Sequence, residues 1–241
     1  MCSREGLKEV FLEANKNLEL VQKGLSDYLE KKRAAFARFY FLSDDELLEI
    51  MSQTKEVRNV RPHLKKVFEA INDLDFRADD CMLAMESSEG ERIDFVKKVD
   101  PKDRNVEYWM GDLERQMTSS VRAVFEIGME RYAVEPRNDW VISNPGQIVL
   151  NASQVYWTDE VEKSFNDGVA GVKAYHENLE KQLQNTVLLV RQKLTKLAKI
   201  SVNALIVIDV HARDVVGKLV NENIDDVNAF EWISQLRYYW V

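Results

Sequence analysis

Gly217 and Lys218 form the residue pair that most suggests chemistry, because Gly-Lys ends the phosphate-binding loop of many nucleotide-binding proteins. That loop needs a first Gly, four further residues before the Gly-Lys pair, and a Ser or Thr after it, so that backbone amides hold phosphate where a strand meets a helix. Here Ala212 stands at the first position and Leu219 at the last, inside a helical pattern. The sequence therefore does not predict a nucleotide site at this pair.

Three neighbouring acids, residues 44–46, and three histidines are the other candidates for catalysis or metal binding. The acids follow Ser43 as in a capping box, in which the Ser43 hydroxyl accepts from the Glu46 amide and the Glu46 carboxylate accepts from the Ser43 amide. The histidines lack the local spacing of a metal motif, and no Ser- or Cys-centred nucleophile motif is present. The histidines are His63, His176 and His211. We therefore expect no catalytic, metal-binding or cofactor-binding residues and no enzyme activity, although a site built from residues distant in sequence stays open.

Composition favours a soluble intracellular protein with a sizeable core. Of the 241 residues, 45% are hydrophobic and 31% are charged, which argues against disorder. The net charge of −8 argues against a nucleic-acid partner. Two cysteines, Cys2 and Cys81, cannot form a disulfide framework and suit a reducing compartment. No apolar run is long enough to span a bilayer and no signal peptide is visible, so we expect no membrane partner.

The segment from Lys193 to Asn221 predicts a central helix around which the other elements are organised. Its apolar residues recur at steps of three and four, and they also occupy most of the remaining faces, so other helices should cover it. The stripe consists of Leu194, Leu197, Ser201, Leu205, Ile208, Ala212, Val215 and Leu219, of which Ser201 alone is polar, and Ile200, Val207, Val210 and Val216 lie on the other faces. Its charged residues predict two i,i+4 ion pairs, Asp209 with Arg213 and Asp214 with Lys218.

The N-terminal third predicts helices followed by one small β-hairpin. A stripe with near-heptad spacing predicts a long helix over Ser3–Arg33, which is either one helix of an intramolecular bundle or a dimerising coiled coil. Residues 38–42 look extended, and helices are expected over Asp44–Gln53 and from Pro62 to about Ala70. Period-two segments within about 81–97 predict the hairpin, which must lean on the helices because an isolated hairpin is marginal in water.

The remainder of the chain predicts mostly long helices. The helical pattern runs from Asn105 to Tyr132, where Gly128 marks either close packing or a bend. The other predicted features are a connector at Glu135–Pro145 with a buried Trp140, a helix from Pro145 to Phe165, a connection at Gly168 and Gly171, a long helix to Val190, a break near Arg191, and a short capped helix at Asn228–Leu236. The aromatic end, residues 237–240, suggests that the native chain continues, because apolar surface seeks cover.

The fold class that follows is mainly α: an elongated rod of multi-helix bundles with one small β-hairpin. We expect two subdomains, residues 1–104 with the N-terminal helices and the hairpin, and residues 105–241 with the long-helix bundle.

Six stretches of the sequence, in this order, together resemble one protein family. The stretches are Gln22–Leu25 with Tyr28–Glu30, Arg38–Ser43 with Asp45–Ile50, Glu89–Glu91, Asn144–Gln147 with Gln154 and Trp157–Thr158, Ile208–Val215, and Gln235–Trp240. They resemble the linker region of dynein heavy chains, which precedes the AAA+ motor ring. None is decisive alone, but six in register are specific, and Phe41–Ser43 looks more like axonemal than cytoplasmic members.

The resemblance implies a mechanical role. In this family the linker is a lever that lies across the ring and changes shape as the ring binds and hydrolyses ATP, which drives movement on microtubules. It implies that ATP and Mg are bound by the ring, outside this segment. The implied partners are the AAA+ ring of the same heavy chain, microtubules through the stalk, and dynein intermediate and light chains through the tail. The implied location is the cytoplasm and cytoskeleton, in the axoneme of a cilium or flagellum, and the segment itself is expected to be monomeric.

Two hypotheses assign residues to this role, with a hinge between about Asn105 and Pro145 and ring contacts at residues 38–42 or at the hairpin tip. The candidate hinge and ring-contact residues are Gly128, Pro136 and Pro145, and Arg38, Tyr40, Phe41, Glu89 and Glu91. The alternative function is a non-motor helical scaffold or coiled-coil tether, which would require the first helix to self-associate.

Overall fold

The computed structural model describes residues 6–52 and 56–241, and it is mainly α-helical with a small antiparallel sheet. Cys2, Ser3 and Gln53, which figure in the predictions above, lie outside the described residues. The chain divides into two compact units, Met1–Ser120 and Val121–Val241. The boundary falls inside helix α4, Val106–Tyr132, at whose start the sequence placed the subdomain boundary.

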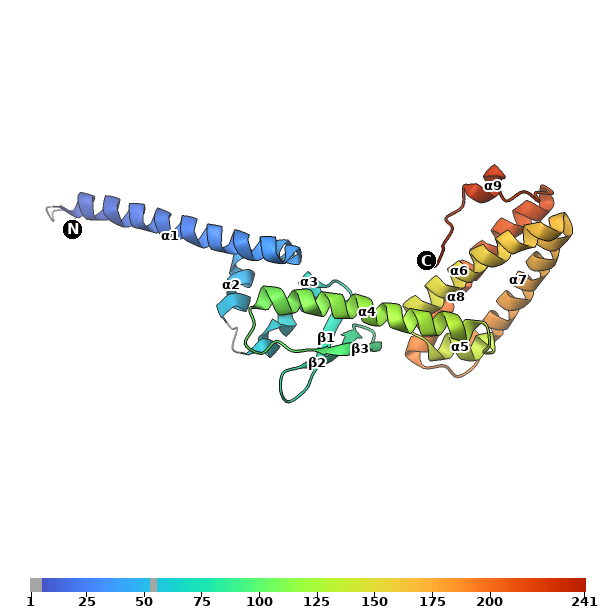
Figure 1. Ribbon diagram of the computed structural model, residues 1–241, viewed down its shortest axis with the longest axis horizontal. Coiled ribbons are helices and arrows are strands. Elements are labelled where there is room, and N and C mark those ends of the chain that lie inside the picture. The colour runs from blue at the N-terminus through green and yellow to red at the C-terminus, as the bar shows by residue number, and fades with distance from the viewer. Residues whose placement is uncertain (1–5, 53–55) are drawn as a thin grey trace. The chain divides into compact units, whose positions relative to one another are not determined.

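Helix α1, Leu7–Ala35, confirms the long N-terminal helix of the N-terminal unit. Figure 1 shows its first turns projecting away from the rest of that unit, and its apolar side chains there are exposed, with Leu18 at 65% and Val21 at 67%. Of the residues of α1, only Leu29, near the C-terminal end of the helix, is buried. The helix ends at Phe36, whose extended backbone ends the helical hydrogen-bond ladder.

The sequence suggested that residues 38–42 are extended, and this prediction was wrong for residues 38–41, although Leu42 is extended. Ala37–Phe41 form a 3₁₀ helix, η1, in which Phe39 is fully buried. A 3₁₀ helix repeats every three residues, so an aromatic run of five positions is too short to display its period.

Helix α2, Asp44–Ser52, begins with the predicted capping box. The Glu46 amide donates to Ser43 Oγ over 3.3 Å, and the Ser43 amide donates to Glu46 Oε2 over 3.0 Å. The predicted helix at Pro62 is instead a 3₁₀ helix, η2, Val57–His63, followed by α3, Leu64–Val67. It ends before Ala70 because Phe68 is extended and leads into a strand.

The β element is a three-stranded antiparallel sheet rather than a lone hairpin. The strands are β1, Ile71–Phe76, β2, Met82–Ser87, and β3, Arg92–Val99, in the order β1-β2-β3. The sequence-based prediction missed β1, because Asn72, Asp73 and Asp75 interrupt its apolar pattern. The third strand supplies support that an isolated hairpin lacks.

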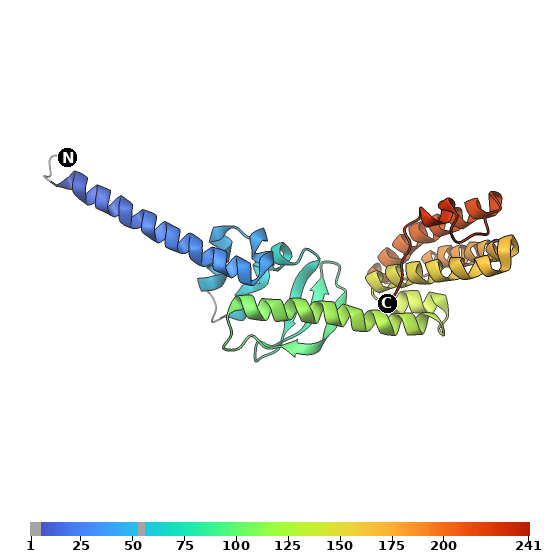
Figure 2. The same cartoon turned by 45° about the horizontal axis from the view of Figure 1, so that its top comes forward.

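The first part of α4 covers this sheet, as Figure 2 shows. Two backbone amides of β3 donate to its side chains, Val96 to Ser120 Oγ over 3.0 Å and Lys97 to Gln116 Oε1 over 3.1 Å. These bonds satisfy amides on the open edge of the sheet.

The C-terminal unit is a helical bundle in which α6, α7 and α8 lie side by side (Figure 1). Its helices are α5, Arg137–Ser143, α6, Gly146–Ser164, α7, Gly168–Val190, α8, Lys196–Asn221, and α9, Phe230–Ile233, with a 3₁₀ turn, η3, at Phe165–Asp167. Helix α8 confirms the predicted central helix and contacts α5, α6 and α7. Its cover is incomplete, because Val207 is 69% exposed.

Three predicted boundaries in this unit were wrong. The Glu135–Pro145 segment is not a plain connector, since it contains α5 with a fully buried Trp140. Gly171 lies inside α7, where a Cβ atom would come within 2.3 Å of the Ser164 carbonyl oxygen. The last helix has only four residues and no side-chain cap. The break near Arg191 is confirmed, and Thr195 caps α8 by accepting from the Ala198 amide over 3.2 Å.

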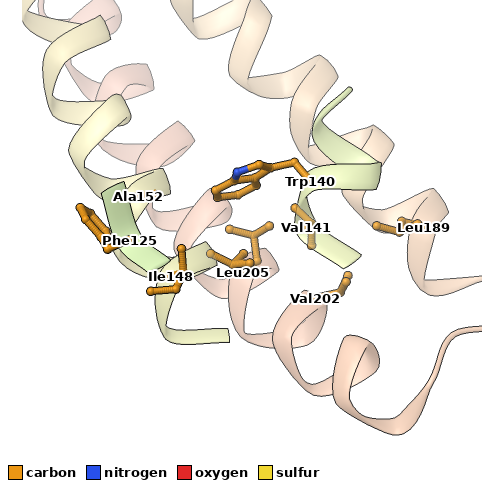
Figure 3. Close-up of a cluster of buried hydrophobic side chains, with 9 residues drawn as sticks. Phe125, Trp140, Val141, Ile148, Ala152, Leu189, Val202 and Leu205 are labelled. Carbon is orange, nitrogen blue, oxygen red and sulfur yellow. The ribbon is translucent and has the colours of Figure 1, made fainter. Parts of the chain in front are cut away.

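The core of the C-terminal unit contains two clusters of buried apolar side chains. Figure 3 shows the first, in which Trp140, Ile148 and Leu205 gather between the helices. The second surrounds Trp232, whose ring centroid lies 5.2 Å from that of Trp157. Clusters of this kind hold bundle helices in a fixed arrangement because large apolar side chains interlock.

The aromatic C-terminal segment finds partial cover within this unit. The Tyr238 amide donates to Thr158 Oγ1 over 3.0 Å, and the Trp240 ring lies 4.6 Å from that of Phe125. Tyr239 and Trp240 nevertheless remain 57% and 42% exposed.

Candidate functional site

Arg38, a candidate ring contact, is held by groups of its own unit. Its Nε donates to Glu114 Oε1 on α4 over 2.6 Å, and a terminal nitrogen donates to the Val67 carbonyl oxygen over 3.2 Å. Its guanidinium also lies 5.1 Å from the Phe68 ring centroid. Arg38 therefore ties η1 to α3 and α4, whether or not it also meets another surface.

Tyr40 and Phe41, on the same 3₁₀ helix, present their rings to the surface. They are 59% and 67% exposed. The Tyr40 hydroxyl donates to Glu30 Oε2 over 3.2 Å, and this bond raises the pKa of Tyr40. Two neighbouring exposed rings are a surface that a partner could cover with a gain in free energy.

Glu89 and Glu91 lie in the turn between β2 and β3. The Ser87 hydroxyl accepts from the amides of both, over 3.2 Å and 3.1 Å, and Gly90 supplies the positive φ of 91° that the turn needs. The backbone of the turn is thereby fixed, while the Glu89 side chain is exposed. This candidate contact comes from a different element than Arg38, Tyr40 and Phe41.

Gly128, a candidate hinge residue, lies where two helices approach closely. A Cβ atom there would come within 2.5 Å of Ile148 Cγ2 on α6, and the Gly128 carbonyl oxygen accepts from Trp140 Nε1 over 2.8 Å. Of the two explanations for this glycine, close packing is the one that these contacts support. Helix α4 continues past it to Tyr132.

Pro136 and Pro145, the other hinge candidates, each precede the first residue of a helix, α5 and α6 respectively. The segment between them is tied to α4 through Arg131. Its guanidinium donates to Glu135 over 2.6 Å and 2.9 Å, and to Ser143 Oγ over 2.8 Å. The structure thus brings the surroundings of Gly128 and Pro145 together in one packed region of the C-terminal unit.

A polar cluster in the core of the C-terminal unit was not found from the sequence. Arg137 donates to both carboxylate oxygens of Asp209, over 2.7 Å and 2.9 Å. Thr186 Oγ1 lies 3.2 Å from the same carboxylate and 2.9 Å from the Gln182 carbonyl oxygen, and its single proton can serve one of them at a time. Burial opposes the charge of Arg137, but Asp209 and the other neighbours outweigh this effect and leave the pKa of Arg137 raised.

This cluster corrects the two ion pairs predicted for α8. Asp209 binds Arg137 rather than Arg213, which instead binds Asp214, and Lys218 lies 3.8 Å from Glu222. Spacing along one helix revealed the possible local pairs, but Asp209 is buried and faces another helix. The one signal in the sequence was that Asp209 lies on an apolar stripe of the helix, because a buried carboxylate needs a partner, which can come from a distant part of the chain.

Further partly buried titratable groups surround the pair. Tyr175 donates to Glu160 Oε2 over 2.9 Å, and burial raises the pKa of the Glu160 carboxyl. Burial also raises the pKa of Tyr132 to about 12. The Tyr132 ring stacks on that of Tyr156, with centroids 4.0 Å apart.

Comparison with known proteins identifies the family. The family model described as "Dynein heavy chain, N-terminal region 2" matches residues 1–127. The chain belongs to the dynein heavy chain family. It is 48% identical over 240 residues to dynein axonemal heavy chain 1 of Mus musculus, covering 100% of this chain and 6% of that protein.

Other relatives agree. Dynein axonemal heavy chain 3 of Homo sapiens is 47% identical across 98% of this chain, and dynein axonemal heavy chain 12 of Mus musculus is 45% identical across 99% of it. The chain spans 6% and 8% of those two proteins. These identities confirm the resemblance to axonemal members. The chain corresponds to a small part of each of these heavy chains.

The described part of this dynein heavy chain segment contains no group of three or more His, Cys, Asp or Glu side chains placed to hold a metal ion. Across residues 6–52 and 56–241, no helix is both long and apolar enough to cross a membrane.

Proposed function

We propose that this segment is the mechanical linker of a dynein motor. In this proposal it changes conformation over the AAA+ ring during the ATP cycle and so produces the power stroke on microtubules. The observation that carries the proposal is the position of the boundary between two compact units, inside a helix of a chain that belongs to this family. A lever needs stiff parts and a defined place to bend.

The sequence of α4 next to that boundary favours bending there. Thr118 Oγ1 donates to the Glu114 carbonyl oxygen over 3.1 Å, and Ser119 Oγ donates to the Arg115 carbonyl oxygen over 2.7 Å. Such bonds to the preceding turn weaken the helical ladder and often bend helices. Thr and Ser also have lower helix propensity than Ala. This place lies within the 105–145 range proposed from the sequence, but away from Gly128, Pro136 and Pro145.

The test is to stiffen this part of α4 in the intact motor. Replacing both Thr118 and Ser119 by Ala removes the side-chain bonds and raises helix propensity. We expect microtubule gliding to slow while ATP hydrolysis by the ring is retained. Glu130→Ala, at an exposed position of the same helix, is the matched control. Gliding at the unmodified speed in the double variant would remove α4 as the bending point.

The wider assignments follow from the same proposal. ATP and Mg would be bound by the motor ring and not by this segment, microtubules by the stalk, and intermediate and light chains by the tail. The axonemal relatives favour a cytoskeletal location in a cilium or flagellum. In the N-terminal unit, the exposed rings of Tyr40 and Phe41 and the turn at Glu89 are the proposed contacts with the ring.

A non-motor scaffold or coiled-coil tether is the second candidate, and one observation favours it. The apolar stripe of α1 is exposed, including Phe11 at 60% and Leu18 at 65%. A second copy of the helix could cover this stripe. Sedimentation of the chain separates the candidates, because the linker proposal expects a monomer.

A further inference from the structure

Three residues of the C-terminal unit, each with a buried polar atom that lacks a hydrogen-bond partner, line one small cavity. Among the described residues, five buried side-chain polar atoms lack a hydrogen-bond partner, and three of them are Arg137 Nε, Ser153 Oγ and Trp157 Nε1. All three residues line the same cavity. Ser153 and Trp157 are only 6% and 8% exposed. Buried polar groups are nearly always paired, so their meeting at one cavity points to a bound partner.

The size and chemistry of the cavity select that partner. It offers about 10 Å³ to the centre of a water molecule, and a single water needs at least about 10 Å³ of such space and two to four polar partners. Arg137 Nε and Trp157 Nε1 are N–H donors, whereas the Ser153 hydroxyl can donate or accept. Two N–H donors disfavour a metal cation, and the space is too small for an organic ligand.

We propose that this cavity binds one water molecule, which accepts hydrogen bonds from Arg137 Nε and Trp157 Nε1 and donates one to Ser153 Oγ. The water links α5, which carries Arg137, to α6, which carries the other two residues. This proposal does not depend on the mechanical role proposed above.

The surrounding contacts give this water a structural purpose. A terminal nitrogen of Arg137 is bound to Asp209 on α8, and Thr186 Oγ1 on α7 lies 3.2 Å from the same carboxylate. A buried ion pair stabilises a fold only when its remaining polar atoms are also satisfied. The water satisfies the remaining Nε of Arg137 and completes a polar network that spans α5, α6, α7 and α8.

Magnetic resonance of the 28.0 kDa chain tests the water directly. The five tryptophans give separate indole N–H signals, and Trp157→Phe and Trp232→Phe assign two of them by loss of a signal. We expect a cross-peak between bound water and the Trp157 indole proton. Trp232 is the matched control, because its Nε1 is also buried and unpaired but it does not line this cavity. Absence of the Trp157 cross-peak from the unmodified chain overturns the proposal.

Chemical denaturation of variants gives a second test. The change in the denaturant midpoint caused by Ser153→Ala has opposite signs for a cavity that holds a water and for a dry cavity. If a water bridges the groups, Ser153→Ala and Trp157→Phe each lower the denaturant midpoint, and their effects are coupled because both lose the same water. If the cavity is dry, Ser153→Ala removes an unsatisfied buried hydroxyl and raises the midpoint. The cycle that pairs Ser153→Ala with Trp232→Phe should show no coupling. Additive effects of Ser153→Ala and Trp157→Phe overturn the proposal.

Discussion

The indole nitrogen of Trp140 donates a hydrogen bond to the backbone oxygen of Gly128 over 2.8 Å, at the point where α4 meets α6. Trp140 is fully buried, and its only side-chain polar group is satisfied by this bond. The absence of a side chain at Gly128 lets Ile148 approach. The pair therefore fixes α5 and α6 against α4 inside the C-terminal unit.

Gly128→Ala tests this close packing. The added Cβ would come within 2.5 Å of Ile148 Cγ2, and such overpacking costs about 1–3 kcal/mol. The gain of about 1 kcal/mol in helix propensity only partly offsets it. We expect a lower free energy of unfolding in urea. Adding Ile148→Ala should relieve the clash. The double variant should therefore lose less free energy of unfolding than the sum of the losses in the two single variants.

Gly24→Ala is the matched control, because nothing lies within 4 Å of a Cβ atom built there on α1. The same substitution should leave stability unchanged or raise it by up to about 1 kcal/mol. Equal effects at positions 24 and 128 would argue that packing at Gly128 is unimportant.

Exchanging Arg38 with Glu114 separates a structural role from a ring contact. Arg38→Glu alone places two acids together and leaves the Val67 carbonyl oxygen without its donor. The loss should be small, up to about 1 kcal/mol for the ion pair, because both side chains are 40% exposed. Adding Glu114→Arg should restore the part of the urea midpoint that the ion pair contributes.

The same exchange in the intact motor decides the functional question. If Arg38 also contacts the ring, the stable double variant should still glide more slowly on microtubules. Full recovery of gliding together with stability would leave Arg38 with its structural role alone.

The lowered pKa of the Glu46 carboxyl predicts that the free energy of unfolding decreases in acid. The bond from Lys66 and the Ser43 amide lower the pKa of the Glu46 carboxyl from 4.5 to about 2. A group whose pKa falls on folding contributes stability above its unfolded pKa, and the contribution disappears as the pH falls from about 4.5 to about 2. The urea midpoint should therefore fall over this range, and less so in Glu46→Gln. Equal pH dependence of the two proteins would contradict this assignment.

The chain should sediment as a monomer despite the exposed stripe of α1. Leu18→Glu, at a residue 65% exposed, should then change neither the sedimentation coefficient nor the stability. A dimer that this substitution dissociates would support the coiled-coil alternative, because a charge at a core position of a coiled coil is destabilising.

Local sequence signals predicted the long helices well. The stripe of α4, the capping box at Ser43 and the break near Arg191 involve residues close together in the chain, and the structure confirms all three. Strand β1 escaped prediction because its acids hide the period-two pattern, although Arg61 and Arg92 bind Asp73 and Asp75 in the fold.

Contacts between distant residues could not be predicted from one sequence. Asp209 has an arginine four residues later, which suggested a local pair, but burial of the carboxylate selects Arg137, 72 residues away. Arg38 was named only as a candidate ring contact, because its partner Glu114 lies 76 residues further along. Spacing rules describe one helix face and say nothing about which other helix will cover it.

The most direct test of the central claim is the distance between the two units in the intact motor. Fluorescent probes at Lys65 of the N-terminal unit and Glu180 of the C-terminal unit, both exposed, would report it. A second pair at Glu130 and Glu180, both in the C-terminal unit, is the control. We predict that energy transfer between Lys65 and Glu180 differs between the ATP-bound and nucleotide-free motors, while the control pair stays constant. Constant transfer in both pairs across all nucleotide states would contradict the account of this segment as a bending lever.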